Sequence, residues 1–210
     1  MLYDITPLVS SALAVWPGDT PPSREVLMDM ARGDALTLST LRATVHLGAH
    51  ADAPSHYGEP APSIEARPLD LYLGVCQVIQ VRAERGRRLG LEDLGSEIEA
   101  KRVLLVTGTF PDPTRWNEDF AALEPDLVDA LHALGVRLVG IDTPSVDLFP
   151  SKDLPAHKRF FAHDMAILEG LVLKDVPQGL YELIALPLKL QGFDASPVRA
   201  VLRSLAPAVS

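Results

Sequence analysis

Residues 124–141 read Glu124-Pro-Asp-Leu-Val-Asp-Ala-Leu-His-Ala-Leu-Gly135-Val-Arg-Leu-Val-Gly-Ile141 and join a helix pattern to a strand pattern. A proline in the first turn, an acidic residue beside it and an apolar stripe predict a helix over Glu124–Leu134. Gly135 predicts the end of this helix, and the apolar run Val136–Ile141 predicts a strand that follows at once. A helix next to a buried strand is typical of α/β folds.

Further strand patterns lie on both sides of this unit. Three are short, nearly continuously apolar and rich in β-branched residues, which favours strands covered on both faces: Val75–Val81, Val103–Thr107 and Leu183–Leu186. Leu38–Val45 alternates more and predicts a strand that leads into a histidine-rich segment. Two more helices are expected, over Glu92–Ala100 and Ser196–Leu205. Since the chain shows no repeat and no linker, we expect a single α/β domain over residues 1–210, with a mixed β-sheet.

Composition and charge narrow the classes of function. The 210 residues are 47% apolar and carry a formal charge of -9, from 19 Lys+Arg and 28 Asp+Glu. This acidic balance argues against binding to nucleic acid or to an anionic membrane surface, because both need basic patches. The start of the chain does not resemble a signal peptide, and no apolar run reaches the ~18 residues of a membrane span. A cytoplasmic protein is therefore expected. The single cysteine, Cys76, excludes an intrachain disulfide and is expected to be buried.

The segment His46-Leu-Gly-Ala-His50-Ala-Asp52-Ala-Pro-Ser-His56 carries half of the six histidines of the chain. Imidazole and carboxylate are the ligands expected for zinc, and they also suit manganese or iron. Any one of these histidines alone would more simply be a surface residue or a satisfied core residue. The density of the set favours a metal site over that alternative.

Geometry limits how this segment can fold. In a straight strand, His46 and His50 would lie ~13 Å apart at ~3.3 Å per residue, which is too far for one metal ion. The chain must therefore curl near Gly48, and Pro54 prevents a regular helix from continuing to His56. We expect a compact loop at the end of a strand, with His46, His50 and Asp52 converging.

A second group of candidate ligands lies far away in sequence, in His157-Lys-Arg-Phe-Phe-Ala-His163-Asp164-Met-Ala-Ile-Leu-Glu169. Spacing alone does not choose among its two imidazoles and two carboxylates. Glu169 has apolar neighbours, and a carboxylate near a core is costly unless it is paired or binds a metal. The alternative is an exposed glutamate at a helix end.

Two other segments are candidates for a binding cleft. Trp16-Pro17-Gly18-Asp19 places a large aromatic side chain in a loop, where it could stack on an aromatic substrate or pack in the core. Gly140-Ile-Asp142-Thr-Pro-Ser145-Val-Asp147 follows a predicted strand, and its carboxylates either line the same cleft or form turns. The chain has no Gly-x-Ser-x-Gly elbow, phosphate-binding glycine loop or dinucleotide fingerprint.

Taken together, these motifs resemble the cyclase-like metal-dependent hydrolases, and within them the kynurenine formamidase (arylformamidase) branch. The pattern His46-x-Gly48-x-His50-x-Asp52-x-Pro54-x-His56 carries the resemblance, with the segments around Trp16, Asp142 and His157. The resemblance implies a swivelling β/β/α domain that assembles as a homodimer or higher oligomer.

The resemblance also implies a binuclear site with two Zn²⁺ ions per subunit, or Mn²⁺ in their place. The implied metal ligands are His46, His50, Asp52, His157 and Glu169. Asp52 would bridge the two ions, His56 would donate and accept protons, and Trp16 would contact the substrate.

The implied reaction is the hydrolysis of N-formyl-L-kynurenine, a small aryl formamide, to L-kynurenine and formate in tryptophan breakdown. Two alternatives stay open. The first is a related amide or lactam hydrolase, such as an isatin hydrolase. The second is a metal-binding regulatory or storage protein without catalytic activity.

Overall fold

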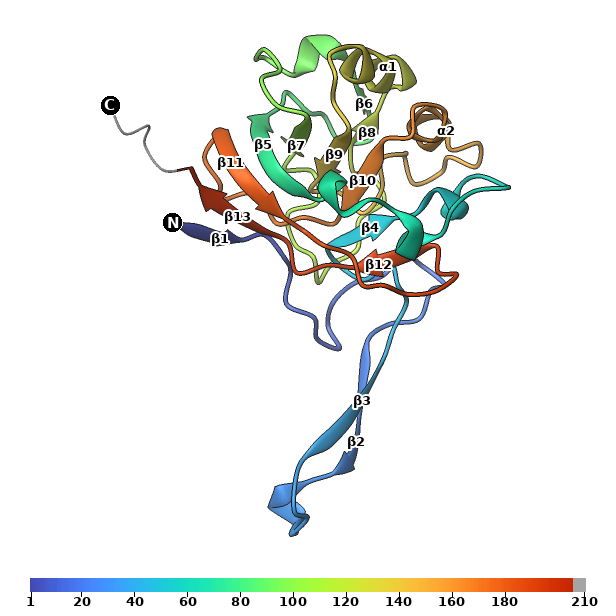
Figure 1. The fold of residues 1–210 in the computed structure, drawn as a ribbon, viewed down its shortest axis with the longest axis vertical. Coiled ribbons are helices and arrows are strands. Elements are labelled where there is room, and N and C mark those ends of the chain that lie inside the picture. Colours follow the sequence, from blue (N-terminus) through green and yellow to red (C-terminus); the bar gives the residue numbers. More distant parts are fainter. Residues whose placement is uncertain (206–210) are drawn as a thin grey trace.

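The computed structural model describes residues 1–205, and a nine-stranded mixed sheet runs through it (Figure 1). The strand order is β1-β13-β11-β5-β7-β9-β10-β4-β12. The strands are β1 (Leu2–Asp4), β4 (His50–Asp52), β5 (Leu73–Gln80), β7 (Arg102–Val106), β9 (Leu138–Ile141), β10 (Ala166–Glu169), β11 (Gly179–Ile184), β12 (Ala195–Pro197) and β13 (Val201–Ser204). Strands β5, β7, β9 and β10 run parallel, and the other pairings are antiparallel. The predicted α/β fold with a mixed sheet is confirmed.

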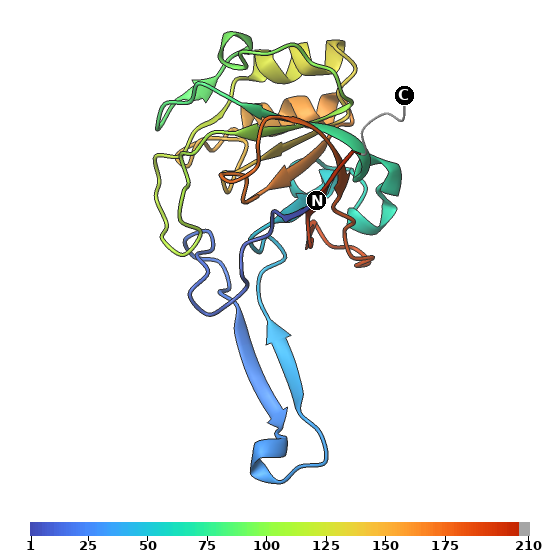
Figure 2. The ribbon, with the colours of Figure 1, turned by 90° about the vertical axis from the view of Figure 1, so that its left-hand side faces the viewer.

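Two α-helices, α1 (Pro125–Ala133) and α2 (Pro155–Ala162), lie over one face of this sheet (Figure 2). Helix α1 agrees with the prediction, because Glu124 is its N-cap and Gly135, in a left-handed conformation at φ +86°, lies just beyond its C-cap. Its apolar stripe is buried, and β9 follows as expected. Short 3-10 helices are η1 (Met30–Arg32), η2 (Pro54–His56), η3 (Ile64–Ala66), η4 (Leu69–Leu71) and η5 (Leu91–Asp93).

Two apolar layers hold the sheet in place. Leu131 of α1 and Phe160 of α2 pack with Val139 of the sheet on the helix side. On the opposite face, Val78 and Leu202 belong to a second cluster that fills the curl of the sheet. The sheet is therefore covered on both faces at its centre, and the burial of apolar surface is the main source of its stability.

Two predicted helices are wrong. Residues 196–205 form parts of β12 and β13, because Leu202 turns into the core and Arg203 pairs with Glu182 of β11 across the strands. Residues 92–100 contain only the end of η5 and irregular turns, in which the side chain of Gln77 bonds the backbone of Glu97 and Glu99 at 2.8 Å each. Contacts with distant strands override local helix propensity in both places.

The predicted core strands are confirmed with shifted ends. Strands β5, β7 and β9 occupy the expected positions, and Cys76 of β5 is fully buried. Strand β11 starts earlier than expected and alternates between buried and half-buried residues, so it is not covered on both faces. Its place between β13 and β5 near one side of the sheet accounts for this alternation.

A long hairpin projects from the body of the molecule, and we call residues 20–45 the arm (Figures 1 and 2). It consists of β2 (Ser23–Met28) and β3 (Leu38–Arg42), which pair only with each other among the described residues. The prediction of a strand in Leu38–Val45 is thus correct, but the strand does not join the main sheet. Its base is closed by a bond from Thr44 N to Thr20 O of 3.0 Å.

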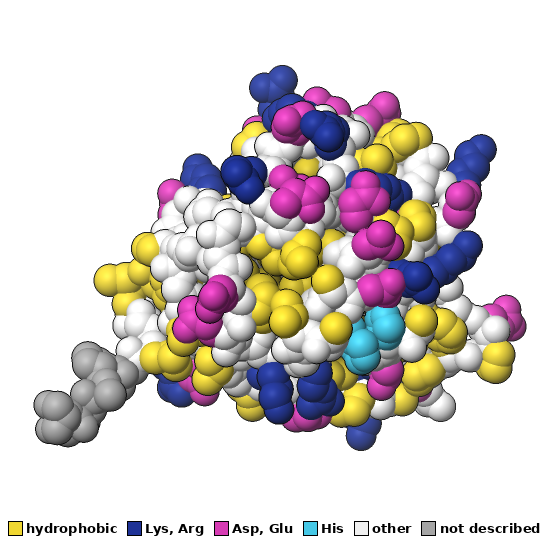
Figure 3. Space-filling view, turned by 90° about the horizontal axis from the view of Figure 1, so that it is seen from above, with side chains coloured by type: hydrophobic (Ala, Val, Ile, Leu, Met, Phe, Trp, Pro, Cys, Tyr) yellow, Lys and Arg dark blue, Asp and Glu magenta, His cyan; other side chains and the backbone are white. Residues whose placement is uncertain are grey.

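A third sheet is very short, since β6 (Arg88–Leu89) pairs with β8 (Ala122–Leu123). Within residues 1–205, none of the helices has the length and hydrophobicity needed to cross a membrane. On the face seen in Figure 3, basic and acidic side chains are interspersed, so this face has no continuous basic patch.

Candidate metal centre

The chain turns back sharply between His46 and His50. Gly48 has φ +56°, and an added Cβ would lie 2.8 Å from the Pro7 side chain, so this position favours glycine. As a result, the two imidazole rings have centroids only 5.0 Å apart. The predicted curl is confirmed.

The rest of the segment is more regular than the predicted loop. Residues His50–Asp52 form β4, which is buried between β10 and β12, and His56 ends the 3-10 helix η2. The expected convergence of His46, His50 and Asp52 is found, but residues 50–52 form a strand where a loop was predicted. Pairing on both sides satisfies the β4 backbone and fixes the His50 and Asp52 side chains on a rigid element.

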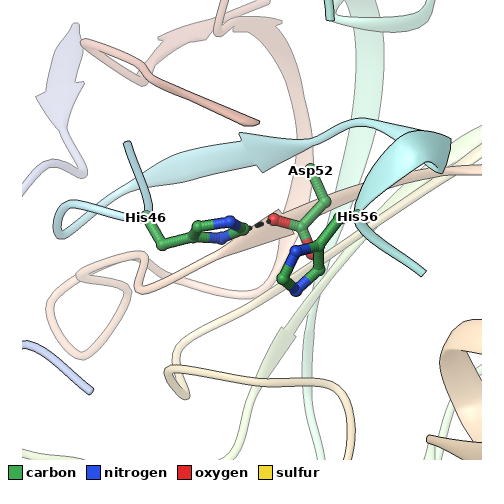
Figure 4. A group of neighbouring side chains, drawn as sticks. All are labelled: His46, Asp52 and His56. Atoms are coloured by element: carbon green, nitrogen blue, oxygen red, sulfur yellow. Dashed lines mark ion pairs between the residues drawn. The ribbon is translucent and has the colours of Figure 1, made fainter. Parts of the chain in front are cut away.

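The buried carboxylate of Asp52 is the meeting point of the imidazoles. Its Oδ1 lies 3.1 Å from His46 Nδ1 and 3.4 Å from His50 Nε2, while its Oδ2 lies 3.5 Å from His157 Nε2. Figure 4 shows His46 and His56 approaching this carboxylate from separate segments. The His46 and His56 rings are 4.2 Å apart at their centroids.

The second ligand group joins the first through β10 and α2. Glu169 ends β10 directly opposite His50 of β4, and its Oε2 lies 3.4 Å from His50 Nε2. His157 of α2 places Nε2 3.7 Å from Glu169 Oε1. Because β4 and β10 are neighbouring antiparallel strands, directly opposed residues share one face of the sheet.

This arrangement also shows which members of the second cluster lie near Asp52. His163 is bound instead by Asp129, at 2.6 Å from Nε2 to Oδ1, and Asp164 pairs with Arg67. Neither residue reaches Asp52. All six residues predicted as ligands or as the proton carrier gather in one place. His163 and Asp164, which spacing alone did not exclude as ligands, lie elsewhere.

Asp147 supports His157 from behind. Its Oδ2 lies 2.8 Å from His157 Nδ1, and its two oxygens accept bonds from the backbone N–H groups of Ala156 and His157 at the start of α2. Arg88 pairs with the same carboxylate at 2.7 Å. Burial opposes the charged form of Asp147, but the bonds from His157 and Arg88 outweigh it and hold the Asp147 pKa below its usual range. From the sequence alone, Asp147 could either line the cleft or form a turn.

Asp194 is a neighbour of the site that the sequence did not indicate. Its Oδ2 lies 3.1 Å from His46 Nε2 and 3.4 Å from His56 Nδ1. It lies in a polar turn, Gln191-Gly192-Phe193-Asp194, with no pattern that distinguishes it from an ordinary turn. Its proximity arises only because β12 pairs with β4.

The charges of the cluster perturb its histidines. Burial disfavours the protonated form of His50, but the carboxylates of Asp52 and Glu169 outweigh it and raise the His50 pKa to about 10. His157 behaves alike, with burial opposed by Asp147 and Asp52, and its pKa is about 10. For His56, burial is the larger influence and lowers the pKa from its usual value.

The donor atoms fit a divalent metal. His50 Nδ1 lies 2.8 Å from Gly48 O, which leaves Nε2 as the free nitrogen of the ring. This Nε2 and both oxygens of Asp52 are buried without a hydrogen-bond partner. Unpaired buried polar atoms are costly, and nitrogen and carboxylate donors at such spacing are typical of zinc or manganese sites. Within residues 1–205, two groups of donor atoms lie close enough together to hold an ion: one from His46, Asp52 and His56, and one from His50, Asp52 and Glu169. His157 Nε2 lies beside the second group, 3.5 Å from Asp52 and 3.7 Å from Glu169.

These residues face a cavity of about 560 Å³. Its wall is mostly apolar and includes Trp16, Trp116 and Phe110. His56 and Glu169 of the polar cluster line the same cavity. Trp16 contacts Trp116 at 5.3 Å and Phe149 at 5.1 Å between ring centroids. Trp16 thus lines the cavity and also packs against other aromatic rings, and its contact with substrate stays a prediction. Trp116 was not indicated by the sequence.

Asp142 also lines this cavity, as one of the two readings of its segment expected. Burial raises its pKa, although bonds from Thr107 and Gly108 partly offset that effect. Those bonds tie Asp142 to the end of β7. The residue is therefore both a cavity wall and a structural link between strands.

The curled mixed sheet brings buried imidazoles and carboxylates to one mostly apolar cavity, an arrangement that suits a metal-dependent enzyme. Residues 3–148 match the family model described as putative cyclase. The chain belongs to this cyclase family.

Solved structures agree with this membership. A potential metal-dependent hydrolase with cyclase activity is 29% identical over 99% of both chains, with a TM-score of 0.85. A predicted metal-dependent hydrolase from Bacillus stearothermophilus is 30% identical over 96% of this chain and 97% of that one, with a TM-score of 0.80. Isatin hydrolase A from Labrenzia aggregata, bound to benzyl benzoate, is 23% identical over 98% and 94%, with a TM-score of 0.81, and this likeness shows the fold alone.

Proposed function

We propose that this chain is a metal-dependent amide hydrolase that cleaves N-formyl-L-kynurenine to L-kynurenine and formate. The observation that carries the proposal is the junction of two features at one cavity. A cluster of metal-binding donors lies beside a wall of tryptophan and phenylalanine side chains. The first feature suits hydrolysis of a carbonyl compound, and the second suits an aryl ring.

The metal centre is proposed to hold two zinc ions, with manganese as the alternative. Asp52 directs one oxygen toward His46 and His50 and the other toward His157, which is the arrangement a bridging carboxylate needs. Glu169, whose two oxygens lie near His50 and His157, would complete the site. Bound there, such ions would supply a water of lowered pKa near neutrality and would polarise the carbonyl under attack.

The protein side chains would do the remaining work. His56 lies at the edge of the cluster and lines the cavity, so its imidazole can take a proton during attack on the formyl carbon. The same ring would return that proton to the aniline nitrogen as the C–N bond breaks. Trp16 would stack on the aryl ring and hold the formamide beside the donors.

A lactam hydrolase of the isatin type is the second candidate. Its support is the structural likeness to isatin hydrolases, of which three are similar at TM-scores of 0.79 to 0.81. Isatin also presents a carbonyl on an aryl nitrogen, so the same donors and the same aromatic wall would serve it. The two substrates differ in the group attached to the aryl ring: N-formyl-L-kynurenine carries a charged amino-acid side chain, and isatin carries none.

Purified protein loaded with Zn²⁺ should be assayed in parallel on N-formyl-L-kynurenine and on isatin. We expect kcat/KM for the formamide to exceed that for isatin by at least tenfold. The reverse ratio would replace the formamidase assignment by the lactam one. Turnover of neither substrate, in protein that binds zinc, would remove the enzymatic proposal and favour a metal-binding protein without catalysis.

We also propose that the protein acts as a homodimer joined through the arm. The arm exposes Leu27, Met30 and Leu38 at its far end, and both views show it extending away from its own body (Figures 1 and 2). An isolated two-stranded hairpin is at best marginally stable in water. The arm would therefore gain stability if a second chain covered it. Its three arginines balance its three acidic residues, so a second copy suits it better than a strongly charged partner.

A further inference from the structure

One carboxylate oxygen faces two imidazoles with different proposed tasks. Asp194 Oδ2 lies 3.1 Å from Nε2 of His46, a candidate metal ligand, and 3.4 Å from Nδ1 of His56, the candidate proton carrier. The two rings are neighbours, with centroids 4.2 Å apart. Both rings belong to the same donor set, with Asp52, and Asp194 belongs to neither set.

The position of Asp194 is fixed through its backbone. Its carbonyl oxygen accepts a bond of 2.8 Å from Ala53 N, directly after the strand that carries Asp52. The next residue, Ala195, pairs with Asp52 in the register of β12 and β4. The side chain itself is 48% exposed, so the apolar core does not depend on it. A rigid backbone thus presents a carboxylate at the rim of the site.

For His46, this contact determines which nitrogen is available to a metal. Its Nε2 faces Asp194, while its Nδ1 faces Asp52 Oδ1 at 3.1 Å inside the cluster. When Nε2–H donates to Asp194, the lone pair lies on Nδ1 and points at the metal-binding donors. A carboxylate that accepts the second N–H of a ligand histidine fixes its tautomer and ring orientation and raises its basicity.

For His56, the same oxygen lies 3.4 Å from Nδ1, close enough for a small rotation of the ring to direct an N–H to it. An N–H at Nδ1 directed to Asp194 leaves the lone pair on Nε2, the nitrogen that is then free to exchange a proton with substrate in the cavity. This is the logic by which a carboxylate orients the imidazole of a hydrolytic triad. We propose that Asp194 is a positioning residue that orients His46 for metal binding and His56 for proton transfer. The second half of this statement rests on the proposed function.

The test uses three variants of the full-length protein. Asp194→Asn keeps the shape and removes the charge, and Asp194→Glu keeps the charge. Glu65→Gln is the control for the loop, because Glu65 Oε1 accepts a 3.0 Å bond from Gly192 N, two residues before Asp194, and lies outside the cavity wall. Zinc affinity is measured by competition with a chromophoric chelator, and kcat and KM are measured at saturating zinc.

Asp194→Asn is expected to lose zinc affinity by ~10–100-fold and, once loaded, to lose kcat by ~10-fold or more with little change in KM. Asp194→Glu should recover most of both losses, and Glu65→Gln should match the wild type. Zinc affinity of Asp194→Asn within twofold of the wild type would overturn the proposal, as would an equal loss in Glu65→Gln. If the wild type hydrolyses neither substrate, the proposed function fails, yet the zinc competition still decides whether Asp194 orients His46.

Discussion

Asp52 is the residue on which the centre depends. It is fully buried, and its carboxylate lies within 3.5 Å of nitrogen atoms from His46, His50 and His157. Burial opposes its charged form, but the imidazoles outweigh that effect and hold the Asp52 pKa well below its usual range. The charged form is therefore present at neutral pH, ready to bind cations. His56 is the most exposed member of its donor set, so we expect its loss to separate catalysis from metal binding.

His56→Ala should retain bound zinc and lose turnover by roughly two orders of magnitude, because a positioned proton carrier contributes about that factor. Elemental analysis and steady-state kinetics on the same sample check both parts. Asp52→Ala is the companion variant and should lose zinc and turnover together. Near-normal turnover in His56→Ala would remove its role as the proton carrier.

Metal binding should release protons. In the metal-free protein, His50 and His157 have pKa values of about 10, so both are protonated at pH 8, whereas a ligand imidazole must be neutral. The raised pKa values stabilise the metal-free fold fully below the ordinary value of 6.5, and this stabilisation is lost as pH rises toward 10. Zinc affinity should accordingly increase with pH between these values.

Calorimetric zinc titrations at pH 8, in buffers of different ionisation enthalpy, measure this release. We expect more than one proton per chain. Heats that do not depend on the buffer would contradict the protonated state of the two histidines.

The first group of candidate ligands could be predicted from the sequence because its members lie close together in one motif. Eleven positions contain all four of its members, His46, His50, Asp52 and His56, and Gly48 indicates the turn between the first two. Asp194 was not predictable, since a lone aspartate in a turn has no pattern and reaches the site only through strand pairing. The choice of Glu169 over Asp164 likewise needed the register of β10 against β4.

Strand β4 brings the histidine motif together with residues that are distant in the sequence. It is only three residues long, yet pairing with β10 and β12 delivers Glu169 on one side and Asp194 on the other. Helix α2 brings His157 from above the same region and relies on Asp147 for its orientation. The arm enters this region too, because its second strand leads through Val45 to His46.

The arm should mediate self-association. Leu27→Ser should raise the dimer dissociation constant by ~10-fold or more, because burial of a leucine at an interface contributes about 1.5–3 kcal/mol. Leu91→Ser is the matched control, since Leu91 and Leu27 are each 51% exposed and Leu91 lies on the body. Sedimentation velocity over a concentration series gives the constants. A wild-type protein that stays monomeric at tens of micromolar would contradict the dimer, and equal weakening by both variants would contradict the arm as its interface.

Sequence patterns predicted helices and strands correctly where the determining contacts are between residues close in the sequence. Helix α1 and β9 agree with residues 124–141, because capping, stripe and glycine all act within a few residues. The segment 196–205 failed because its partners, β1 and β11, are distant in sequence and impose a strand. Helix α2 was not predicted, since it is only eight residues long and its start depends on Asp147.

For the molecule as a whole, the centre links parts of the chain that are far apart in sequence. Ligands from residues 46–56, from α2 and from the end of β10 would be joined by a bound ion, so zinc should stabilise the folded state over the unfolded one. At zinc concentrations a thousandfold above the dissociation constant, this contributes about 4 kcal/mol. For a chain of this size the melting temperature should rise by roughly 10 °C.

Thermal unfolding with and without zinc measures this shift, with Asp52→Ala as the control that should not respond. An unchanged melting temperature in the wild type would show that the ion, if bound, does not join the separate segments of the fold.

The central claim is that Asp52 and its neighbouring imidazoles and carboxylates hold divalent metal. Anomalous diffraction at the zinc absorption edge, from crystals grown with zinc, tests it most directly. We expect two peaks per chain among the side chains of His46, His50, Asp52, His157 and Glu169. A map without a peak among these side chains, or with zinc bound only elsewhere on the protein, would contradict the account.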